Sequence, residues 1–340
     1  MTKWGGNAKK ELLRPTLAML PRVSDGLSFL YADVVRIVQA DSGVCAETET
    51  DSGVVHRVPI PTAALACLLL GPGTSITSSA MATLFRHGTT VVSTGSGGIL
   101  HYGGWMSPDR TAKWMDLQAR AYADDEQRLD VAHAMFELRF GEEVAEGTST
   151  ETLRALEGRR MRNLYQGLAS KYRLKPFKRN YDPESWGDQD PVNKALSSAN
   201  AALYGVVHSV VMHLGCHPGL GFVHSGKQNS FVYDIADLYK AETTIPLAFS
   251  LHDAENPESA ARRRLRSELK LYRMIPRIIR DIQLLLDPDA AGVETEAPKR
   301  WRVVDLWDPQ RGAVAGGVNY GDLAGSPVES PFDDLEEESG

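Results

Sequence analysis

Residues Gly103–Asp109, which read GGWMSPD, divide this 340-residue chain into two parts with different hydrophobic patterns. Before them, from Leu27 onward, short β-branched runs alternate with turn sequences such as Gly71-Pro72-Gly73, a pattern typical of a β-rich domain. Beyond Pro108 the strand signals nearly vanish, and apolar residues recur at helical spacing. The sequence therefore predicts an α+β protein, in which this linker joins a small N-terminal β-rich domain to a larger, mainly helical domain.

The predicted elements follow from these patterns and from the turn residues that separate them. Strands are expected at Phe29–Val38, Val54–Pro59, Ala64–Leu70, Thr90–Ser93 and Ile99–Tyr102, with one short helix at Ser78–His87. Long helices are expected at Thr111–Phe140, Ser149–Tyr172, Val192–Leu214, Ser230–Ala241 and Ala260–Leu286. We expect an N-terminal extension over 1–26, the β-rich domain over 27–104, the helical domain over 105–290 and a largely disordered tail over 291–340.

Length and composition indicate a folded, soluble protein. With 42% hydrophobic residues, the chain can bury the cores of about two domains. The N-terminus lacks the apolar run of a signal peptide, and the most apolar long stretch, Ala195–Leu214, contains polar residues, so no membrane span is expected. The three cysteines, Cys45, Cys67 and Cys216, form no C-x-x-C pair, which argues against a disulfide framework and is typical of a cytoplasmic protein.

The net charge of −7 argues at first against a nucleic-acid partner, but the distribution of the charges favours one. Residues 321–340 hold seven acidic side chains and no basic one, so the remaining body has a net charge of zero. Within that body, residues 151–180 carry a net charge of +7 and residues 258–280 a net charge of +6. These two basic segments could line a DNA channel, although each could equally be a solvated helix face.

One carboxylate, Glu157, falls on the apolar face of the helix predicted at Ser149–Tyr172 when residues are placed about 100° apart. A buried carboxylate has to be neutralised, hydrogen-bonded, paired with a cation or bound to a metal. The alternative to a metal is a salt bridge to Arg160 or to another arginine of the same helix. A capping box at Thr148-x-x-Glu151 is expected to open the helix, and Gly158 to permit close approach of another group. The apolar face consists of Leu153, Leu156, Met161, Leu164 and Leu168.

Two more acidic residues, Asp234 and Asp237, lie on one flank of the helix predicted at Ser230–Ala241. Neighbouring carboxylates repel unless a cation lies between them, and oxygen ligands favour Mg²⁺ or Mn²⁺ over zinc. His224 lies in a turn-rich loop ten residues before Asp234, from which an imidazole could reach the same ion. Each signal has an ordinary alternative, namely a solvated helix face for the two aspartates and a structural role for the histidine.

A competing zinc site could involve His213 and His217, which have Cys216 between them. Gly215 breaks the helix there, and no glutamate follows His213, so the H-E-x-x-H pattern of zinc enzymes is absent. The chain also lacks the G-x-x-x-x-G-K-[ST] sequence that cradles nucleotide phosphates. We therefore expect neither zinc chemistry nor nucleotide hydrolysis, and predict no residues that bind an organic cofactor.

The segment 221–227, GFVHSGK, continued by 230–237, SFVYDIAD, closely resembles the family of the first CRISPR-associated (Cas) protein, a DNA integrase, in its type I-E branch. The resemblance implies a β-sandwich N-terminal domain, a helical catalytic domain and a homodimer, two copies of which flank a dimer of the second Cas protein. The other similar motifs are MFELRFG at 135–141, LEGRRMR at 156–162, YDP at 181–183, ALYG at 202–205 and LLGPGT at 69–74.

The resemblance also implies a metal site, which maps onto Glu157, His224, Asp234 and Asp237. Glu157, His224 and Asp234 would hold Mg²⁺ or Mn²⁺, and Asp237 would shape the field of the site. The implied reaction is a transesterification, in which the 3′-hydroxyl of captured double-stranded DNA with 3′ overhangs attacks a phosphodiester at the edge of the CRISPR repeat. With water as the nucleophile, the same site is an endonuclease. DNA contacts are expected from Arg159, Arg162, Lys227, Lys240 and Tyr204.

The chain departs from the family at two positions. Leu100 replaces a residue that is often basic, and Val34 replaces a ring residue that separates duplex ends, for which Tyr31 is a candidate substitute.

The tail contains an apolar run, Trp301–Trp307, which we expect to dock on the second Cas protein as an added strand. The rival function is a non-catalytic DNA-binding scaffold subunit, in which the four site residues form a buried polar network.

Overall fold

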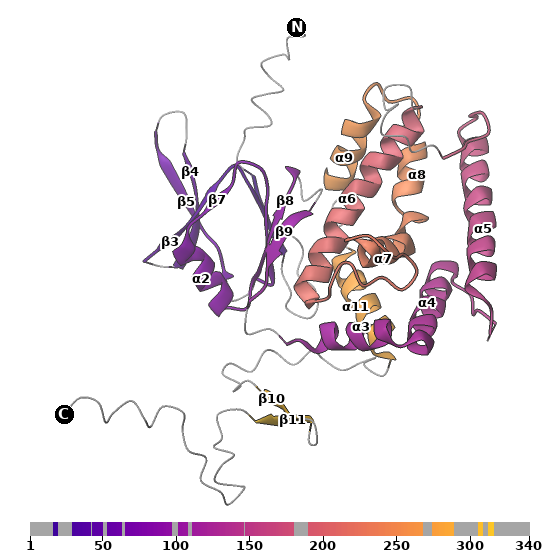
Figure 1. Ribbon diagram of the computed structural model, residues 1–340. Coiled ribbons are helices and arrows are strands. Elements are labelled where there is room, and N and C mark those ends of the chain that lie inside the picture. The colour runs from indigo at the N-terminus through magenta and orange to yellow at the C-terminus, as the bar shows by residue number, and fades with distance from the viewer. Residues whose placement is uncertain are drawn as a thin grey trace, which may run out of the picture. The chain divides into compact units, whose positions relative to one another are not determined.

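The computed structural model describes residues 16–19, 29–41, 43–49, 53–62, 65–96, 101–107, 111–145, 147–179, 190–267, 274–288, 305–308 and 312–315. They belong to two compact units, residues 1–295 and residues 296–340. In the first unit, strands come first and helices dominate after residue 112 (Figure 1). The predicted α+β class and its order of domains are confirmed.

The N-terminal strands form two sheets that share one core. In the five-stranded sheet the order is β1 (Thr16–Met19), β2 (Phe29–Asp33), β6 (Cys67–Leu70), β8 (Thr90–Thr94) and β9 (His101–Trp105). In the four-stranded sheet the order is β5 (Val55–Pro59), β4 (Gly43–Glu49), β3 (Arg36–Ala40) and β7 (Ser75–Ile76). Apolar side chains from both sheets pack together with helix α2 (Ser78–Arg86), so the expected β-sandwich is confirmed.

The predicted strand Phe29–Val38 is wrong in one respect, because Val34 divides it. Val34 adopts φ 54°, a left-handed conformation that is unusual for a β-branched residue, and its N–H donates to Pro72 O at 3.2 Å. The break sends β2 into one sheet and β3 into the other. The sequence patterns also missed β1, β4 and β7, while the first residues of the strand predicted at Ile99–Tyr102 lie outside the described residues.

The helical domain is built around α6 (Pro191–Leu214), which packs against α7, α8, α9 and α11 and against strands β8 and β9 of the sandwich. By length and composition α6 could cross a membrane, but 72% of its most apolar window is buried inside the protein, as expected of a core helix. The surrounding helices are α3 (Lys113–Ala123), α4 (Asp125–Phe140), α5 (Thr150–Lys171), α7 (Ser230–Lys240), α8 (Thr244–Phe249), α9 (Pro257–Ser267) and α11 (Ile275–Leu286).

Two long helices of the prediction are each divided in the structure. Asp124 ends α3 and caps α4, because its side chain accepts hydrogen bonds from the backbone amides of Glu126 and Gln127. The helix predicted at Ala260–Leu286 is represented by α9 and α11, with residues 268–273 outside the described part of the chain. The short helix α8 was not predicted.

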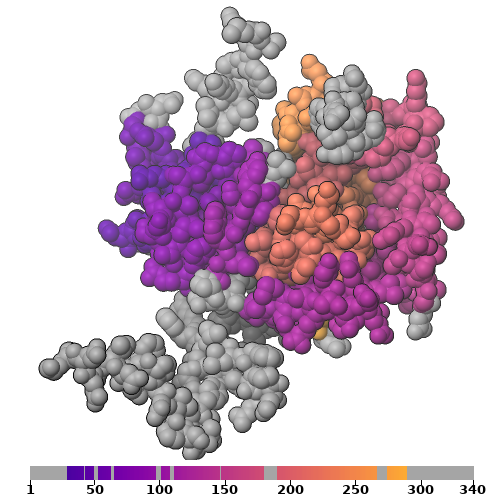
Figure 2. All heavy atoms as spheres, in the orientation of Figure 1, coloured from indigo at the N-terminus to yellow at the C-terminus, as the bar shows by residue number. Residues whose placement is uncertain are grey.

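Helix α5 lies at the outer edge of the helical domain (Figures 1 and 2). Its N-cap is Ser149, whose side chain accepts from the Thr152 amide, so the predicted cap at Thr148 is off by one residue. Leu156 is 41% exposed, which contradicts its predicted place in the apolar stripe. A side chain at Gly158 would meet nothing within 4 Å, so the expected close approach is not found.

The second unit contains one described hairpin. Strand β10 (Asp305–Asp308) pairs antiparallel with β11 (Gly312–Ala315), and Trp307 lies opposite Ala313. The end of the predicted apolar run is therefore a strand that already has a partner on one side. Trp301 and the remainder of the tail lie outside the described residues.

Candidate active site

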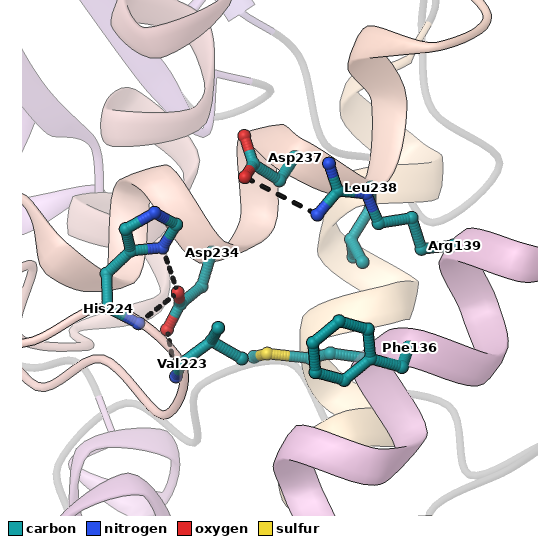
Figure 3. Close-up of a pocket in the computed structure, with 8 residues that line it drawn as sticks. Phe136, Arg139, Val223, His224, Asp234, Asp237 and Leu238 are labelled. Atoms are coloured by element: carbon teal, nitrogen blue, oxygen red, sulfur yellow. Dashed lines mark hydrogen bonds and ion pairs between the residues drawn. The ribbon is translucent and has the colours of Figure 1, made fainter. Parts of the chain in front are cut away.

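Asp234, on the buried face of α7, organises the loop that precedes the helix. Its Oδ2 accepts from the amides of Phe222 (2.6 Å) and Val223 (3.1 Å). Its Oδ1 accepts from the amide of His224 (2.8 Å) and from Nδ1 of the same residue (2.7 Å). Gly221 permits this turn, since a Cβ there would lie 2.6 Å from the His224 carbonyl oxygen. The loop is thus folded around one carboxylate (Figure 3).

The imidazole of His224 is oriented by that carboxylate. A carboxylate only accepts hydrogen bonds, so Nδ1 carries the hydrogen, and in the neutral ring Nε2 has the lone pair. The hydrogen bond that His224 donates to Asp234 raises the pKa of His224, and burial opposes this effect without cancelling it. The ring packs edge-on against Tyr233 at 5.9 Å between centroids, while the side chain remains 44% exposed. His224 therefore presents an accessible nitrogen ligand.

Arg139, from α4, lies between two acidic residues that belong to different helices. Its Nη1 forms an ion pair with Glu157 Oε1 of α5 and lies 3.5 Å from Asp237 Oδ2 of α7. Burial raises the pKa of Glu157, and the positive charge of Arg139 opposes this shift. The sequence offered a salt bridge between Glu157 and Arg160, or another arginine of the same helix, as the alternative to a metal. Glu157 does form an ion pair, but its partner is Arg139 of α4, and Arg160 donates to the Phe140 carbonyl. Arg139 is not among the site residues that the sequence predicts, although it lies in the MFELRFG motif at 135–141.

Lys240 brings a second positive charge to Asp237. Its Nζ lies 2.5 Å from Asp237 Oδ1 and donates to the Tyr204 hydroxyl at 2.6 Å. Asp237 Oδ1 is buried, so this close ion pair is shielded from solvent. Burial lowers the pKa of Lys240, but Asp237 and Tyr204 outweigh it and the pKa is raised. Two of the predicted DNA contacts, Lys240 and Tyr204, thus engage each other beside the acidic residues.

Three of the four predicted site residues, His224, Asp234 and Asp237, line one pocket, and Glu157 is linked to it through its ion pair with Arg139. Glu157, Asp234 and Asp237 supply three negative charges and Arg139 and Lys240 two positive ones, which leaves a net charge of −1 with neutral His224. As they stand, the described residues include no cluster of three His, Cys, Asp or Glu side chains arranged to hold a metal. The pocket is lined by Met135, Phe136, Arg139, Val223, His224, Asp234, Asp237 and Leu238 (Figure 3).

The donor set nevertheless fits a divalent cation. Carboxylate oxygens with one imidazole nitrogen suit Mg²⁺ and Mn²⁺, and the net charge of the site is negative. Both oxygens of Asp237 face cations, Oδ1 facing Lys240 and Oδ2 facing Arg139. The zinc alternative gains no support. His213 is buried and faces Thr90, and burial raises the pKa of the Cys216 thiol to about 12, which disfavours the thiolate that zinc binds.

The other predicted contact residues lie on the surface or in the core. Arg159 and Arg162 are exposed on α5, and Lys227 is exposed in the loop that carries His224. Tyr31 is only 5% exposed and donates its hydroxyl hydrogen to Asp33 at 2.7 Å, so it is unsuited to separate the ends of a duplex. Leu100 lies outside the described residues.

The chain thus joins a β-sandwich to a helical domain that gathers a glutamate, a histidine and two aspartates. The family described as "CRISPR associated protein Cas1" matches residues 138–258. The CRISPR-associated endonuclease Cas1 of Clostridium sp. (strain SY8519) is 37% identical over 88% of this chain and 98% of that protein. A Cas1 endonuclease of Thermus thermophilus is 38% identical over 93% of this chain and 97% of that protein. The chain belongs to the Cas1 family.

Solved structures agree with this assignment. A crystal structure of a TtCas1–DNA complex superposes with a TM-score of 0.69 at 37% identity, covering 79% of this chain and 99% of that one. A casposase bound to its integration product superposes with a TM-score of 0.53 at 15% identity, which shows a shared fold. This chain therefore has the fold of the solved Cas1 structures, and the curated relatives that it matches are named as CRISPR-associated endonucleases.

Proposed function

We propose that this protein is a metal-dependent integrase and endonuclease of CRISPR adaptation, of type I-E, that joins the 3′-hydroxyl ends of captured DNA to the CRISPR repeat by transesterification. The observation that carries the proposal is the pocket lined by His224 and Asp237, to which Arg139 joins Glu157 through ion pairs with both carboxylates. The names of the relatives as endonucleases support it, as does the DNA complex of a similar protein. One phosphodiester replaces another, so no nucleotide has to be hydrolysed.

The hydrogen bonds favour a different division of labour between the two aspartates from the one that the sequence predicted. Asp234 accepts four hydrogen bonds, one of them from His224 Nδ1, so its oxygens are already engaged. A carboxylate that orients a histidine whose other nitrogen binds metal is a common arrangement. We therefore assign metal contact to Glu157, His224 Nε2 and Asp237, and assign the orientation of His224 to Asp234.

A bound Mg²⁺ or Mn²⁺ would polarise the scissile phosphodiester and stabilise the departing oxygen. The surrounding residues bind and position the DNA. Lys227 is exposed in the loop that carries His224 and could hold a phosphate, whereas Arg159 and Arg162 are exposed on α5 and could follow the DNA backbone. Lys240 offsets negative charge at Asp237, and Tyr204 offers an aromatic face beside it.

The proposal includes a cytoplasmic homodimer that works with the second Cas protein, double-stranded DNA with 3′ overhangs and the CRISPR repeat. We place the contact with the second Cas protein in the tail, where β10 forms part of a hairpin in residues 296–340. Deletion of residues 295–340 should leave the homodimer intact and weaken the complex with the partner. Gel filtration decides this point, because undiminished complex formation by the truncated protein would place the contact elsewhere.

The reaction itself is tested by integration of a labelled duplex with 3′ overhangs into a plasmid that carries a repeat, in Mg²⁺, in Mn²⁺ or in EDTA. Glu157→Gln, His224→Ala and Asp237→Asn should each lower the rate by about 100-fold or more while DNA binding persists. Glu142→Gln, at an exposed acidic residue, is the control. Wild-type rates in two of the three variants, or in EDTA, would leave the non-catalytic scaffold as the better account.

A further inference from the structure

A single nitrogen atom of Arg139 occupies the space between two carboxylates. Nη1 is paired with Glu157 Oε1 and lies 3.5 Å from Asp237 Oδ2, so one positively charged group serves an acidic residue of α5 and another of α7. The arginine itself comes from a third helix, α4, and its side chain is 12% exposed. Figure 3 shows its guanidinium pointing toward Asp237 at the rim of the pocket.

Such a contact compensates a definite electrostatic cost. Two half-buried carboxylates repel each other, and burial raises the pKa of Glu157 despite the neighbouring arginine. A guanidinium keeps its charge at every physiological pH and is less strongly hydrated than an ammonium, so it can remain in a partly buried site. Arg139 therefore places one positive charge between Glu157 and Asp237, where a divalent ion would place two.

We propose that Arg139 is the resident counter-ion of the metal-free site, and that the divalent cation competes with its guanidinium for Glu157 and Asp237. The inference rests on the proposed function, because it takes these two carboxylates as metal ligands. Metal entry then requires Arg139 to release at least one carboxylate oxygen. The arginine keeps α4, α5 and α7 together without metal, and it weakens metal binding by the same contact.

The competing explanation is that Arg139 only positions Glu157 for the metal. The two roles predict opposite changes in metal affinity when the arginine is replaced. If Arg139 competes with the cation, its removal strengthens metal binding, since the pocket becomes more negative and its carboxylates become available. If Arg139 positions Glu157, its removal weakens metal binding, since the ligand is no longer held in place.

Titration of the metal-free, full-length protein with Mn²⁺ by calorimetry distinguishes these roles without an activity measurement. Arg139→Gln should bind Mn²⁺ at least about tenfold more tightly than the wild type, whereas its metal-free form should melt at a lower temperature. Arg139→Lys, which keeps the charge on a compact ammonium, should show a smaller change in the same direction. Arg120→Gln, at an exposed arginine of α3, is the control and should match the wild type.

Unchanged or weaker Mn²⁺ binding by both Arg139 variants would overturn the counter-ion role. If Arg139→Gln does not fold without metal, the direction of the change in Arg139→Lys decides the question. Glu157→Gln separates this inference from the proposed function, because its Mn²⁺ binding should be lost. Failure of the wild type itself to bind Mn²⁺ would instead refute the metal site on which the proposed function depends.

Discussion

Nδ1 of His224 lies 2.7 Å from Oδ1 of Asp234, and the backbone amide of the same histidine donates to the same oxygen. The two contacts couple the orientation of the imidazole to the path of the loop. Asp237, three residues further along α7, instead faces the side chains of Arg139 and Lys240. Two aspartates on one flank of a helix thus have different surroundings, and their substitution should have different effects.

Replacing the two aspartates separately should distinguish structure from metal binding. Asp234→Asn puts an amide where four donors meet, so we expect a loss of about 3 kcal/mol in the free energy of unfolding. Asp237→Asn should abolish the rise in melting temperature that Mn²⁺ produces in the wild type, whereas Asp234→Asn should retain part of that rise. Thermal melts with and without Mn²⁺ provide both measurements. A Mn²⁺ response lost only in Asp234→Asn would restore the assignment made from the sequence.

The exposed arginines of α5 should account for part of the salt dependence of DNA binding. Each phosphate contact contributes about −0.9 to the slope of log affinity against log salt concentration on duplex DNA. Reversing the charge at Arg159 and Arg162 together should therefore make the slope less negative by about 2. The paired control reverses Arg57 and Arg120, which are exposed elsewhere on the chain. Equal slopes for the test and control proteins would place the DNA away from α5.

Val34 should be a position at which a smaller residue stabilises the fold. Its φ of 54° costs a β-branched residue about 1–2 kcal/mol, a cost that glycine does not bear. Val34→Gly should raise the free energy of unfolding by about 1 kcal/mol, less the lost side-chain contacts. Val35→Gly is the control, because Val35 is buried and outside the positive-φ region, so this change should destabilise. Urea titrations compare the variants, and a destabilised Val34→Gly protein would contradict the strain argument.

Acid should weaken the contact between strand β9 and helix α6. The rings of His101 and His208 stack at 3.5 Å, and burial lowers the pKa of His101 to about 4 and that of His208 to about 3. In the unfolded chain both histidines titrate near pH 6.5, so the unfolded state binds more protons below that pH. The contribution of this pair to the free energy of unfolding is therefore fully present above pH 6.5 and is lost as the pH falls toward 4.

The variant His208→Phe keeps a ring beside His101 and removes one titrating group, so the loss of stability between pH 6.5 and 4 should be smaller. Urea unfolding at several pH values measures it. The control His56→Phe alters an exposed histidine on β5, and its pH dependence should follow the wild type. A pH profile of His208→Phe identical to that of the wild type would show that the stacked pair does not govern acid sensitivity.

Much of the architecture was predictable because the signals are local. Asp190, the N-cap of α6, and Gly215, its left-handed C-cap, bound a strongly apolar run, so the predicted helix Val192–Leu214 is nearly correct. The break at Val34 was not predictable, because valine gives no local sign of a positive φ. Helical angles brought Glu157 to the inner side of α5 correctly, although Leu156 beside it proved exposed.

The interactions within the site depend on contacts between distant parts of the chain. Arg139 belongs to α4, whereas its partners Glu157 and Asp237 belong to α5 and α7. The spacing of residues within α4 gives no sign of partners on other helices. Helical spacing also placed Asp234 and Asp237 on one flank without separating their roles. That difference arises from three backbone amides of the preceding loop, whose path depends on the tertiary fold.

In α5 the buried residues are Leu153 and Ala169 alone, whereas most residues of α6 are buried. Other apolar side chains of α5 pack against the core but are only partly buried, namely Met161, Leu164, Tyr165 and Leu168. Local opening of a helix costs less free energy when it exposes less buried apolar surface, so α5 should detach more readily than α6 unfolds. Its amide protons should accordingly exchange with solvent much faster than those of α6. Glu157 moves with α5, so the fraction of molecules with a complete site is set by the opening equilibrium of this one helix. DNA held by Arg159 and Arg162 would shift that equilibrium toward the closed form.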